Sequence, residues 1–424
     1  MKEKAPESSA PSPRIQEADR RQLRLVTSDL EAMVPGDHSV RAVWSFVEGL
    51  DLSSVYASIK AVEGSPGRPP IDPKILLSVW LQGTLDGVGS ARELERLCRY
   101  HVVYQWICGG VSVNYHTLSD FRSLSENLLD DLLTQSVAVL ISEGVVDLKR
   151  VSQDGMHVRA FAGSKSFRKR RSLEEYQRVA RQQVTRLRKE RDEDPAASKR
   201  RQDAAQDRAS RDREERVARA LKQLPEIEKR KQSNNGKKKS EARVSTTDPD
   251  ARVMKMADGG FRPAFNVHMA TATNCSVIVA VDVNNDGNEA KMMEPLAEQV
   301  FERFGKRPVE WLADGSCVAL DNINRMSRKE PPCLVYGPIR APRRADRKRS
   351  DIRSTDTPAI AEWRARMDTD AAKDIYKERG ATAEWVNAQF RNRGLGQFLV
   401  RGRSKVRSVA LLHALTNNMT RHWH

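Results

Sequence analysis

Apolar residues between positions 22 and 145 recur every three or four residues, the spacing of helices that bury one face. "SVRAVWSFVEGL" and "DPKILLSVWLQGTL" both show this spacing. Asp72 followed by Pro73 suits a helix N-cap and the first helical position. Gly109, the first of two glycines, suits a helix end. The pattern predicts a helical N-terminal domain over residues 22–145.

The pattern changes to strands at residues 148–161, which read as one apolar strand. From residue 258 onward, strands alternate with helices. "GGFRPAFNVHMATAT" and "CSVIVAVDVNND" predict consecutive strands, "VEWLADGS" predicts a strand that ends at an acid, and residues 371–391 predict a helix. Together, residues 146–167 and 251–424 therefore predict an α/β unit whose first strand is separated from the rest.

The separating segment, residues 168–250, is different in kind. Residues 168–243 hold 26 Lys and Arg against 14 Asp and Glu, a net charge of +12 (26 minus 14). Apolar positions such as Leu173, Ala180 and Leu187 still follow helical spacing, and Pro195 interrupts them. We predict two amphipathic helices that form an antiparallel arm. Its role stays open between a solvated hairpin and contact with DNA or with another subunit.

Overall charge narrows the class of partner. The 424 residues carry a formal net charge of +16, which indicates a polyanionic partner. No apolar run approaches the roughly 20 residues of a membrane span, so no membrane association is expected. Residues 1–21 show no signal-peptide pattern and read as a disordered tail. Five scattered cysteines without CxxC spacing disfavour structural zinc and disulfides and predict a cytoplasmic location.

Three carboxylates stand apart from the solvated ones. Asp154 interrupts the apolar strand, Asp314 ends "VEWLAD", and Glu384 lies on the predicted late helix. Buried carboxylates are costly unless they are paired or bind a metal, and converging ones suit Mg²⁺ or Mn²⁺. Asp282, on an alternating strand, is a further candidate ligand. By spacing alone, turn positions for the aspartates and an exposed helix position for Glu384 explain the pattern equally well.

The order of several separated stretches is more specific. "QDGMHVRA", "STTDPDARVMK", "GGFRPAFNVHMAT", "VEWLADGS" and "AEWVNAQFRNRGLGQFLVRGRSK" together resemble the DDE transposases of bacterial insertion sequences. The resemblance implies an α/β ribonuclease-H-like catalytic core, a mixed sheet flanked by helices. It also implies an all-α N-terminal domain, a candidate for binding DNA ends, and a long basic helical insertion after the first core strand. By position, Asp154, Asp314 and Glu384 match the catalytic, metal-binding acids of that family.

A Tyr, Arg, Glu, Lys pattern around the family's glutamate is only partly present. Tyr376 and Arg379 keep the first spacing, but four residues instead of three separate Arg379 from Glu384. Arg391 stands where lysine is common, and Asn387 shares its helical face. The alternative acid is Glu378, whose context matches less well.

Residues 385–424 hold seven Lys and Arg but no Asp or Glu, which predicts a phosphate track for DNA. The candidate phosphate-binding residues are Tyr376, Arg379, Asn387, Arg391, Arg393, Arg401, Arg403, Lys405 and Arg407.

The reaction implied by the resemblance is metal-dependent cleavage at transposon ends followed by strand transfer into target DNA, with two Mg²⁺ or Mn²⁺ ions. The implied partner is double-stranded DNA, and joining two ends requires a homodimer or a higher oligomer. Two alternatives stay open at this point. One is a related nuclease that cuts without strand transfer, and the other is an inactive or domesticated relative that only binds DNA.

Overall fold

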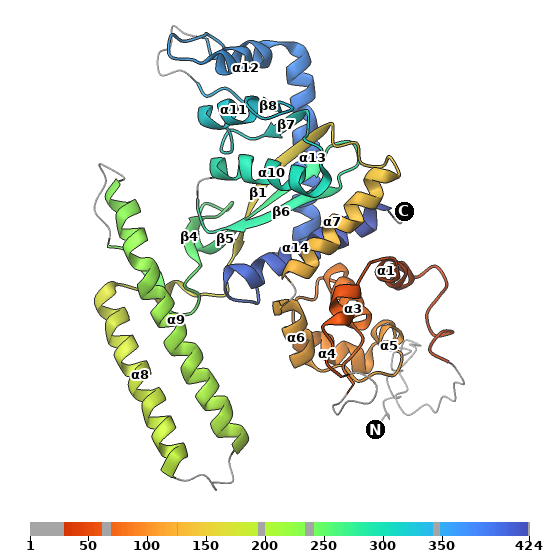
Figure 1. Cartoon of the computed structure of the whole chain (residues 1–424), viewed down its shortest axis with the longest axis vertical. Coiled ribbons are helices and arrows are strands. Elements are labelled where there is room, and N and C mark those ends of the chain that lie inside the picture. The colour runs from red at the N-terminus through yellow and green to blue at the C-terminus, as the bar shows by residue number, and fades with distance from the viewer. Residues whose placement is uncertain are drawn as a thin grey trace, which may run out of the picture.

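The computed structural model describes residues 29–61, 69–124, 126–193, 200–233, 241–287, 289–341 and 348–422. The tail predicted over residues 1–21 lies outside these ranges. Figure 1 shows an N-terminal group of helices, a sheet with its own helices, and a long two-helix arm. Within the described ranges, no helix is long and apolar enough to cross a membrane.

The N-terminal helices begin and end largely where the sequence predicts. Asp72 caps α3 by accepting a hydrogen bond from the Lys74 amide at 2.8 Å, and Pro73 is the first helical residue. Gly109 ends α5 in the left-handed conformation with φ 53°. These two predictions are confirmed. The helices are α1 Ser39–Glu48, α2 Ser53–Ala57, α3 Pro73–Leu85, α4 Ala91–Tyr100, α5 Val102–Cys108, α6 Tyr115–Leu124 and α7 Glu126–Ser142.

The sheet is mixed, with strand order β4-β5-β1-β7-β8 and β6 beside β5. Strand β1 is antiparallel to β5, and β5 is antiparallel to β6. On the other side, β7 is parallel to β1, and β8 is parallel to β7. The strand predicted over residues 148–161 is confirmed as β1. The strands are β1 Arg150–Arg159, β4 Arg252–Lys255, β5 Phe261–Ala272, β6 Ile278–Asn284, β7 Glu310–Ala313 and β8 Leu334–Tyr336.

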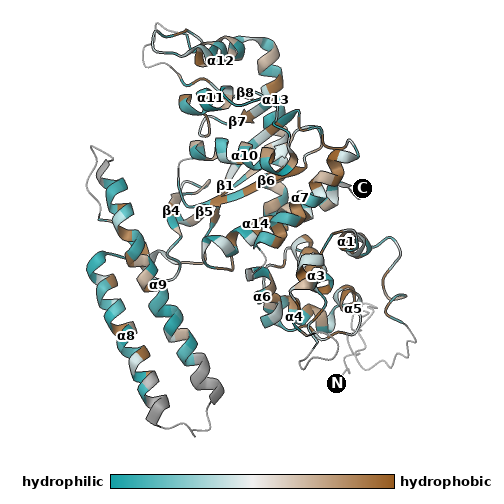
Figure 2. Cartoon of the chain, in the orientation of Figure 1, coloured by the Kyte–Doolittle hydropathy of each residue, from teal (hydrophilic) through white to brown (hydrophobic). Residues whose placement is uncertain are grey.

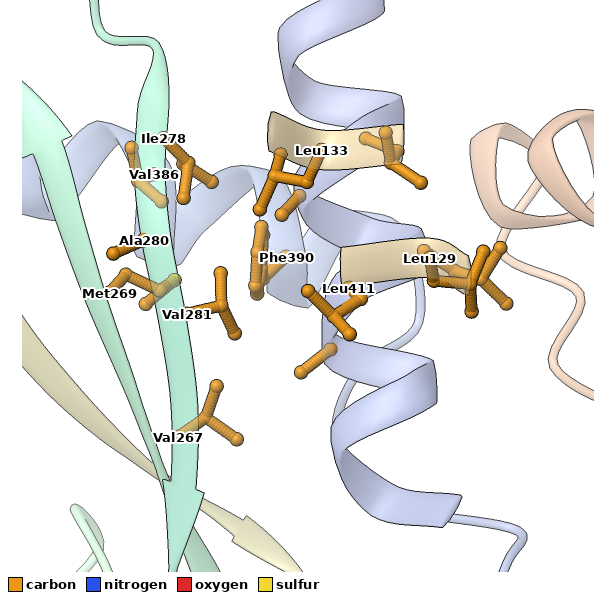
Figure 3. Packing of buried hydrophobic residues seen from close by; sticks show 14 of the residues in the cluster. Leu129, Leu133, Val267, Met269, Ile278, Ala280, Val281, Val386, Phe390 and Leu411 are labelled. Carbon is orange, nitrogen blue, oxygen red and sulfur yellow. The ribbon is translucent and has the colours of Figure 1, made fainter. Parts of the chain in front are cut away.

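Helices from both ends of the chain pack on the sheet. In Figure 3, Met269 of β5 and Val281 of β6 lie close to Phe390 of α13 and Leu411 of α14, with Leu133 of α7 beside them. All five side chains are buried, so the N-terminal helices and the sheet share one core. The remaining elements of this part are η2 Glu289–Met292, α10 Met293–Phe304, α11 Leu320–Ser327, α12 Pro358–Asp368, α13 Asp370–Asn392 and α14 Arg403–His422.

The segment after β1 contains two helices, α8 Arg170–Glu193 and α9 Arg200–Ser233, which lie side by side and antiparallel (Figure 1). Both are largely hydrophilic along their length (Figure 2). A small separate core of Leu173, Ala220 and Leu224 joins them near the sheet. Beside that core, β2 Phe167–Arg168 pairs with β3 Val244–Ser245, and η1 Ser164–Ser166 precedes β2.

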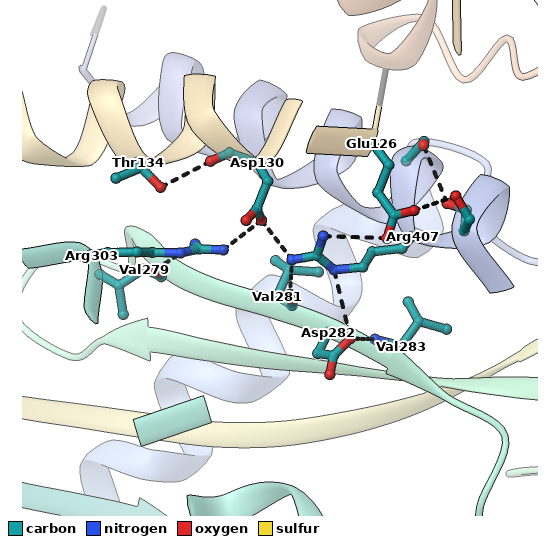
Figure 4. A network of polar contacts seen from close by, with 11 residues as sticks. Glu126, Asp130, Thr134, Val279, Val281, Asp282, Val283, Arg303 and Arg407 are labelled. Atoms are coloured by element: carbon teal, nitrogen blue, oxygen red, sulfur yellow. Dashed lines mark hydrogen bonds and ion pairs between the residues drawn. The ribbon is translucent and has the colours of Figure 1, made fainter. Parts of the chain in front are cut away.

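Arg407, expected to contact phosphate, instead joins α14 to α7 (Figure 4). Its guanidinium lies 2.6 Å from Asp130, 3.4 Å from Glu126 and 3.6 Å from Asp282. The Arg407 side chain is only 13% exposed. Because three carboxylates surround this cation, its charge is compensated within the protein itself.

Candidate active site

Asp154 and Asp314 meet where two parallel strands diverge. The pairing of β1 with β7 ends at Gln153 and Ala313, and the two aspartates are the next residue on each strand. Asp154 continues along β1, whereas the chain turns away after Asp314. Crevices at the carboxyl ends of neighbouring strands are common ligand sites in α/β sheets. Asp314 lies in such a position, and Asp154 lies beside it in the middle of β1.

Helix α13 covers Asp154. Arg379 donates a hydrogen bond to its Oδ1 at 2.8 Å, and Asn387 donates to its Oδ2 at 2.6 Å. These two residues, expected to contact phosphate, thus hold a carboxylate. Arg150 of β1 ion-pairs with Glu378, one position before Arg379, and fixes the same helix. Each of these contacts joins residues more than 220 positions apart in the sequence, so only the folded chain brings them together.

The two aspartates differ in proton affinity. Burial raises the pKa of Asp154, although the Arg379 charge and the Asn387 hydrogen bond oppose this. Burial also acts on Asp314, but hydrogen bonds from Ser316 and from the Cys317 amide outweigh it and lower the pKa of Asp314. A positive charge placed between the two would stabilise the ionised form of both.

Glu289 is a third acid at the same place, and the sequence analysis does not select it. Oxygens of Glu289 and Asp314 and the Cys317 sulfur lie within 4.8 Å of one another. The Glu289 side chain is 16% exposed. Burial raises its pKa, and the charges of Asp314 and Asp154 act in the same direction. Glu289 stands at the start of η2, where an acid reads as an ordinary helix N-terminal residue, so no local pattern distinguishes it.

The other predicted ligands lie apart from this cluster. Glu384 is on the exposed side of α13 and makes no hydrogen bond or ion pair with any described residue. It lies one helical turn before Asn387, which contacts Asp154. Asp282 lies on β6, and β5 separates it from β1. At about 4.8 Å per strand spacing, the backbone at Asp282 is roughly 10 Å from β1, and its carboxylate faces Arg407. The structure does not bring Asp282 to the acidic cluster.

The predicted phosphate-binding residues divide by exposure. Tyr376 is half-buried, and burial raises its pKa. Arg393 is also half-buried and donates a hydrogen bond to Thr420 at 3.0 Å. The exposed ones are Arg391, Arg401, Arg403 and Lys405.

Comparison with protein families gives two matches. Residues 28–124, which hold α1 to α6, match the model described as a transposase domain (DUF772). Residues 340–423, which hold α12 to α14, match the model described as a transposase DDE domain. The chain is an insertion-sequence transposase of the DDE type. It is therefore an enzyme that cleaves DNA and transfers strands, with DNA as its substrate. Searches of curated proteins and of solved structures gave no match to the transposase.

The donor set of the transposase suits the divalent metal that is typical of its family. Asp154, Asp314 and Glu289 offer carboxylate oxygens, the ligands that Mg²⁺ and Mn²⁺ prefer. Burial raises the pKa of the Cys317 thiol strongly, which keeps this sulfur protonated and a poor ligand for a hard cation. The mutual repulsion of the three acids would be relieved by a bound cation.

Proposed function

We propose that the sheet is a ribonuclease-H-like core and that it carries the phosphodiester chemistry of the transposase. The observation that supports this most strongly is the pairing of β6, β5 and β1 as antiparallel neighbours, followed by parallel β7 and β8, with Asp154 on the central strand. Asp314 follows directly after the neighbouring strand β7. This arrangement agrees with the topology that the sequence resemblance implies.

The metal requirement is proposed as two Mg²⁺ or Mn²⁺ ions held by Asp154, Asp314 and Glu384. When bound, such ions activate the attacking oxygen and stabilise the leaving oxygen of a phosphodiester. The protein's part is to fix the carboxylates. Arg379 and Asn387 hold both oxygens of Asp154, and Ser316 donates a hydrogen bond to Asp314 at 2.6 Å. Held in this way, the two aspartates need little reorganisation before reaction.

Two glutamates are candidates for the third carboxylate. Glu384 matches the family's glutamate and lies one helical turn from Asn387, which contacts Asp154. Glu289 already lies beside Asp314. We assign Glu384 as the third ligand and Glu289 as an additional acid of the same site.

Cysteine substitution with a change of metal tests this assignment. A thiolate binds Mg²⁺ poorly but accepts softer ions, so replacing a true ligand by cysteine should abolish cleavage with Mg²⁺ and restore part of it with Mn²⁺. Glu384→Cys is expected to show this rescue on DNA that carries the sequence flanking the gene. Asp374→Cys, on the same helix but with a side chain that is 69% exposed, is the control and should respond equally to both ions. Rescue of Glu289→Cys together with indifference of Glu384→Cys would make Glu289 the third carboxylate.

The DNA assembly is proposed to contain two copies of the chain. Transposition joins two ends of one element to a target, and each site described above has one set of carboxylates. Light scattering with end DNA should therefore give a mass of at least two chains per complex. A mass of only one chain per complex, under conditions of full strand transfer, would contradict this.

A further inference from the structure

A basic groove lies at the root of the arm. One hollow of about 500 Å³ is lined by Arg168, Arg213, Arg216 and Arg401, and none of its described lining residues is acidic. A second hollow of about 510 Å³ shares Arg216 and Arg401 with it and continues to Lys405. We call these two connected hollows the arm-root groove. It brings together α9, the chain after β1 and the turn before α14.

The cations of the groove are poorly neutralised. Within the described part of the chain, no carboxylate lies within ion-pair distance of Arg213 or Arg401. Among the described residues, Arg216 forms an ion pair only with Asp212, whose side chain is 71% exposed. Burial lowers the pKa of Arg401 and the charge of Arg216 lowers it further, so these two guanidiniums repel each other, although the charges of Asp248 and Asp212 act in the opposite direction. An anion between them would be stabilised.

Acidic residues on the wall of the second hollow do not cancel this charge. Asp248 is fully buried and accepts a hydrogen bond from the Gly402 amide. Asp212 and Glu215 lie on the exposed side of α9, towards solvent. Asp212, Glu215 and Asp248 line the second hollow, so the part of the groove that no described acid lines is the first hollow.

The "STTDPDAR" stretch builds this arrangement. Asp250 accepts hydrogen bonds from Arg219 at 2.7 Å, from Gln223 at 2.7 Å and from the Arg403 amide at 3.2 Å. It thereby fixes α9 to the start of α14. The contact holds Arg216 on one side of the groove opposite Arg401 on the other. The stretch belongs to the family resemblance but contributes no acid to the active site, so this contact gives it a role.

The groove is connected to the active site through a single strand. Phe161, whose ring lies 4.9 Å from the Arg401 guanidinium, follows Asp154 by seven residues. At ~3.3 Å per strand residue, this separation is at most about 23 Å, because β1 ends at Arg159. Duplex DNA rises ~3.4 Å per base pair, so the same length corresponds to roughly seven base pairs.

We propose that the arm-root groove binds the sugar-phosphate backbone of the duplex at the transposon end, about seven base pairs from the bond that is cut. This inference rests on the proposed chemistry at Asp154 for the position of the cut. Guanidiniums bind phosphate oxygens bidentately, and the first hollow of the groove offers those of Arg168, Arg213, Arg216 and Arg401 with no acid among its described lining residues. The arm is then a DNA-holding element rather than only a solvated hairpin.

The test removes the groove charges and measures binding in EDTA, where no cleavage occurs. The variant is Arg213→Gln/Arg216→Gln/Arg401→Gln. The control, Arg178→Gln/Arg211→Gln/Lys222→Gln, removes three charges from arm positions outside both hollows. The probe is a linear duplex that carries the sequence flanking the gene. Each phosphate contact changes affinity as roughly the 0.9 power of salt concentration, so each is worth about eightfold at 0.1 M salt.

The groove variant is expected to bind about 500-fold more weakly than the wild type at 0.1 M salt, with a salt slope smaller by about 2.7. The arginine-to-lysine triple variant keeps the charge and should recover most of the affinity, which excludes a folding defect. Ethylation of phosphates about seven base pairs from the cut should weaken binding by the wild type but not by the groove variant. Equal affinity and equal salt slope for groove and control variants would overturn the proposal. Wild-type binding without any metal-dependent cleavage would instead refute the proposed chemistry and leave the groove measurement valid.

Discussion

Asp250 gives the sharpest prediction about how the arm is attached. Its carboxylate is the shared acceptor for Arg219, Gln223 and the Arg403 amide, and its side chain is 12% exposed. Substitution Asp250→Ala removes this acceptor and leaves all three donors in place. The contact between α9 and α14 is therefore expected to open more often, while the N-terminal helices should be unaffected.

The magnitude follows from the exposure of each donor. Arg219 is 46% exposed and can be hydrated after the substitution, so its ion pair contributes less than about 1 kcal/mol. The hydrogen bonds from Gln223 and from the Arg403 amide to a charged, mostly buried acceptor contribute about 1 kcal/mol or slightly more each. The sum is about 3 kcal/mol, which corresponds to roughly 100-fold more frequent opening at 1.36 kcal/mol per factor of ten.

Hydrogen exchange measures this opening segment by segment. Peptides covering residues 216–224 and 401–407 should exchange about 100-fold faster in Asp250→Ala, and peptides from α3 should not change. Asp212→Ala is the control, because that carboxylate lies on α9, the helix of Arg219 and Gln223, but is 71% exposed. Unchanged exchange at the arm root, or equal acceleration throughout the chain, would refute the reasoning.

Three further predictions concern stability. Arg407→Leu should lower the free energy of unfolding by about 2–3 kcal/mol, since it leaves Asp130 with one cation fewer. The same variant should leave the salt slope of DNA binding unchanged, whereas a slope smaller by about 0.9 would show that Arg407 contacts phosphate. Gly394→Ala should lower the thermal midpoint, because φ is 80° and a Cβ would lie 2.8 Å from the Gly87 carbonyl oxygen; an unchanged midpoint would contradict the close approach. Burial acts to raise the pKa of Asp250, but the hydrogen bonds that this carboxylate accepts outweigh burial and lower its pKa. The ionised carboxylate therefore stabilises the fold at pH values above the ordinary pKa of an aspartate, and this stabilisation is lost as the pH falls through the folded-state pKa. Arm-root exchange should therefore accelerate below about pH 4 in the wild type and not in Asp250→Ala.

The elements with a strong local pattern were predictable from the sequence. Strand β1 carries the apolar residues Val151, Met156 and Val158 around a single acid, Asp154, and the arm keeps helical spacing despite its charge. The helix α12 was missed, although Thr357 and Pro358 form an N-cap and first position before well-spaced apolar residues.

The details of the active site depended on contacts that no local pattern contains. Glu289 is a candidate site residue only because the turn after β7 brings Asp314 close to it. Arg379 and Asn387 looked like phosphate ligands because their cationic and polar character was visible, whereas their partner was not. The presence of a site built from carboxylates and cations was therefore predictable from the residue types, but which side chains contact one another could be known only from the folded chain.

Cleavage of the DNA that flanks the gene, by the wild type and by Asp154→Asn, tests the central claim most directly. With Mg²⁺, the wild type should cut at the element's end and join the freed 3′ end to a second DNA, and EDTA should stop both steps. Asp154→Asn should bind the same DNA with unchanged affinity at low salt but produce neither cut nor joined product. Cutting by Asp154→Asn at the wild-type rate would contradict the account, because the carboxylate on β1 would then have no part in the reaction.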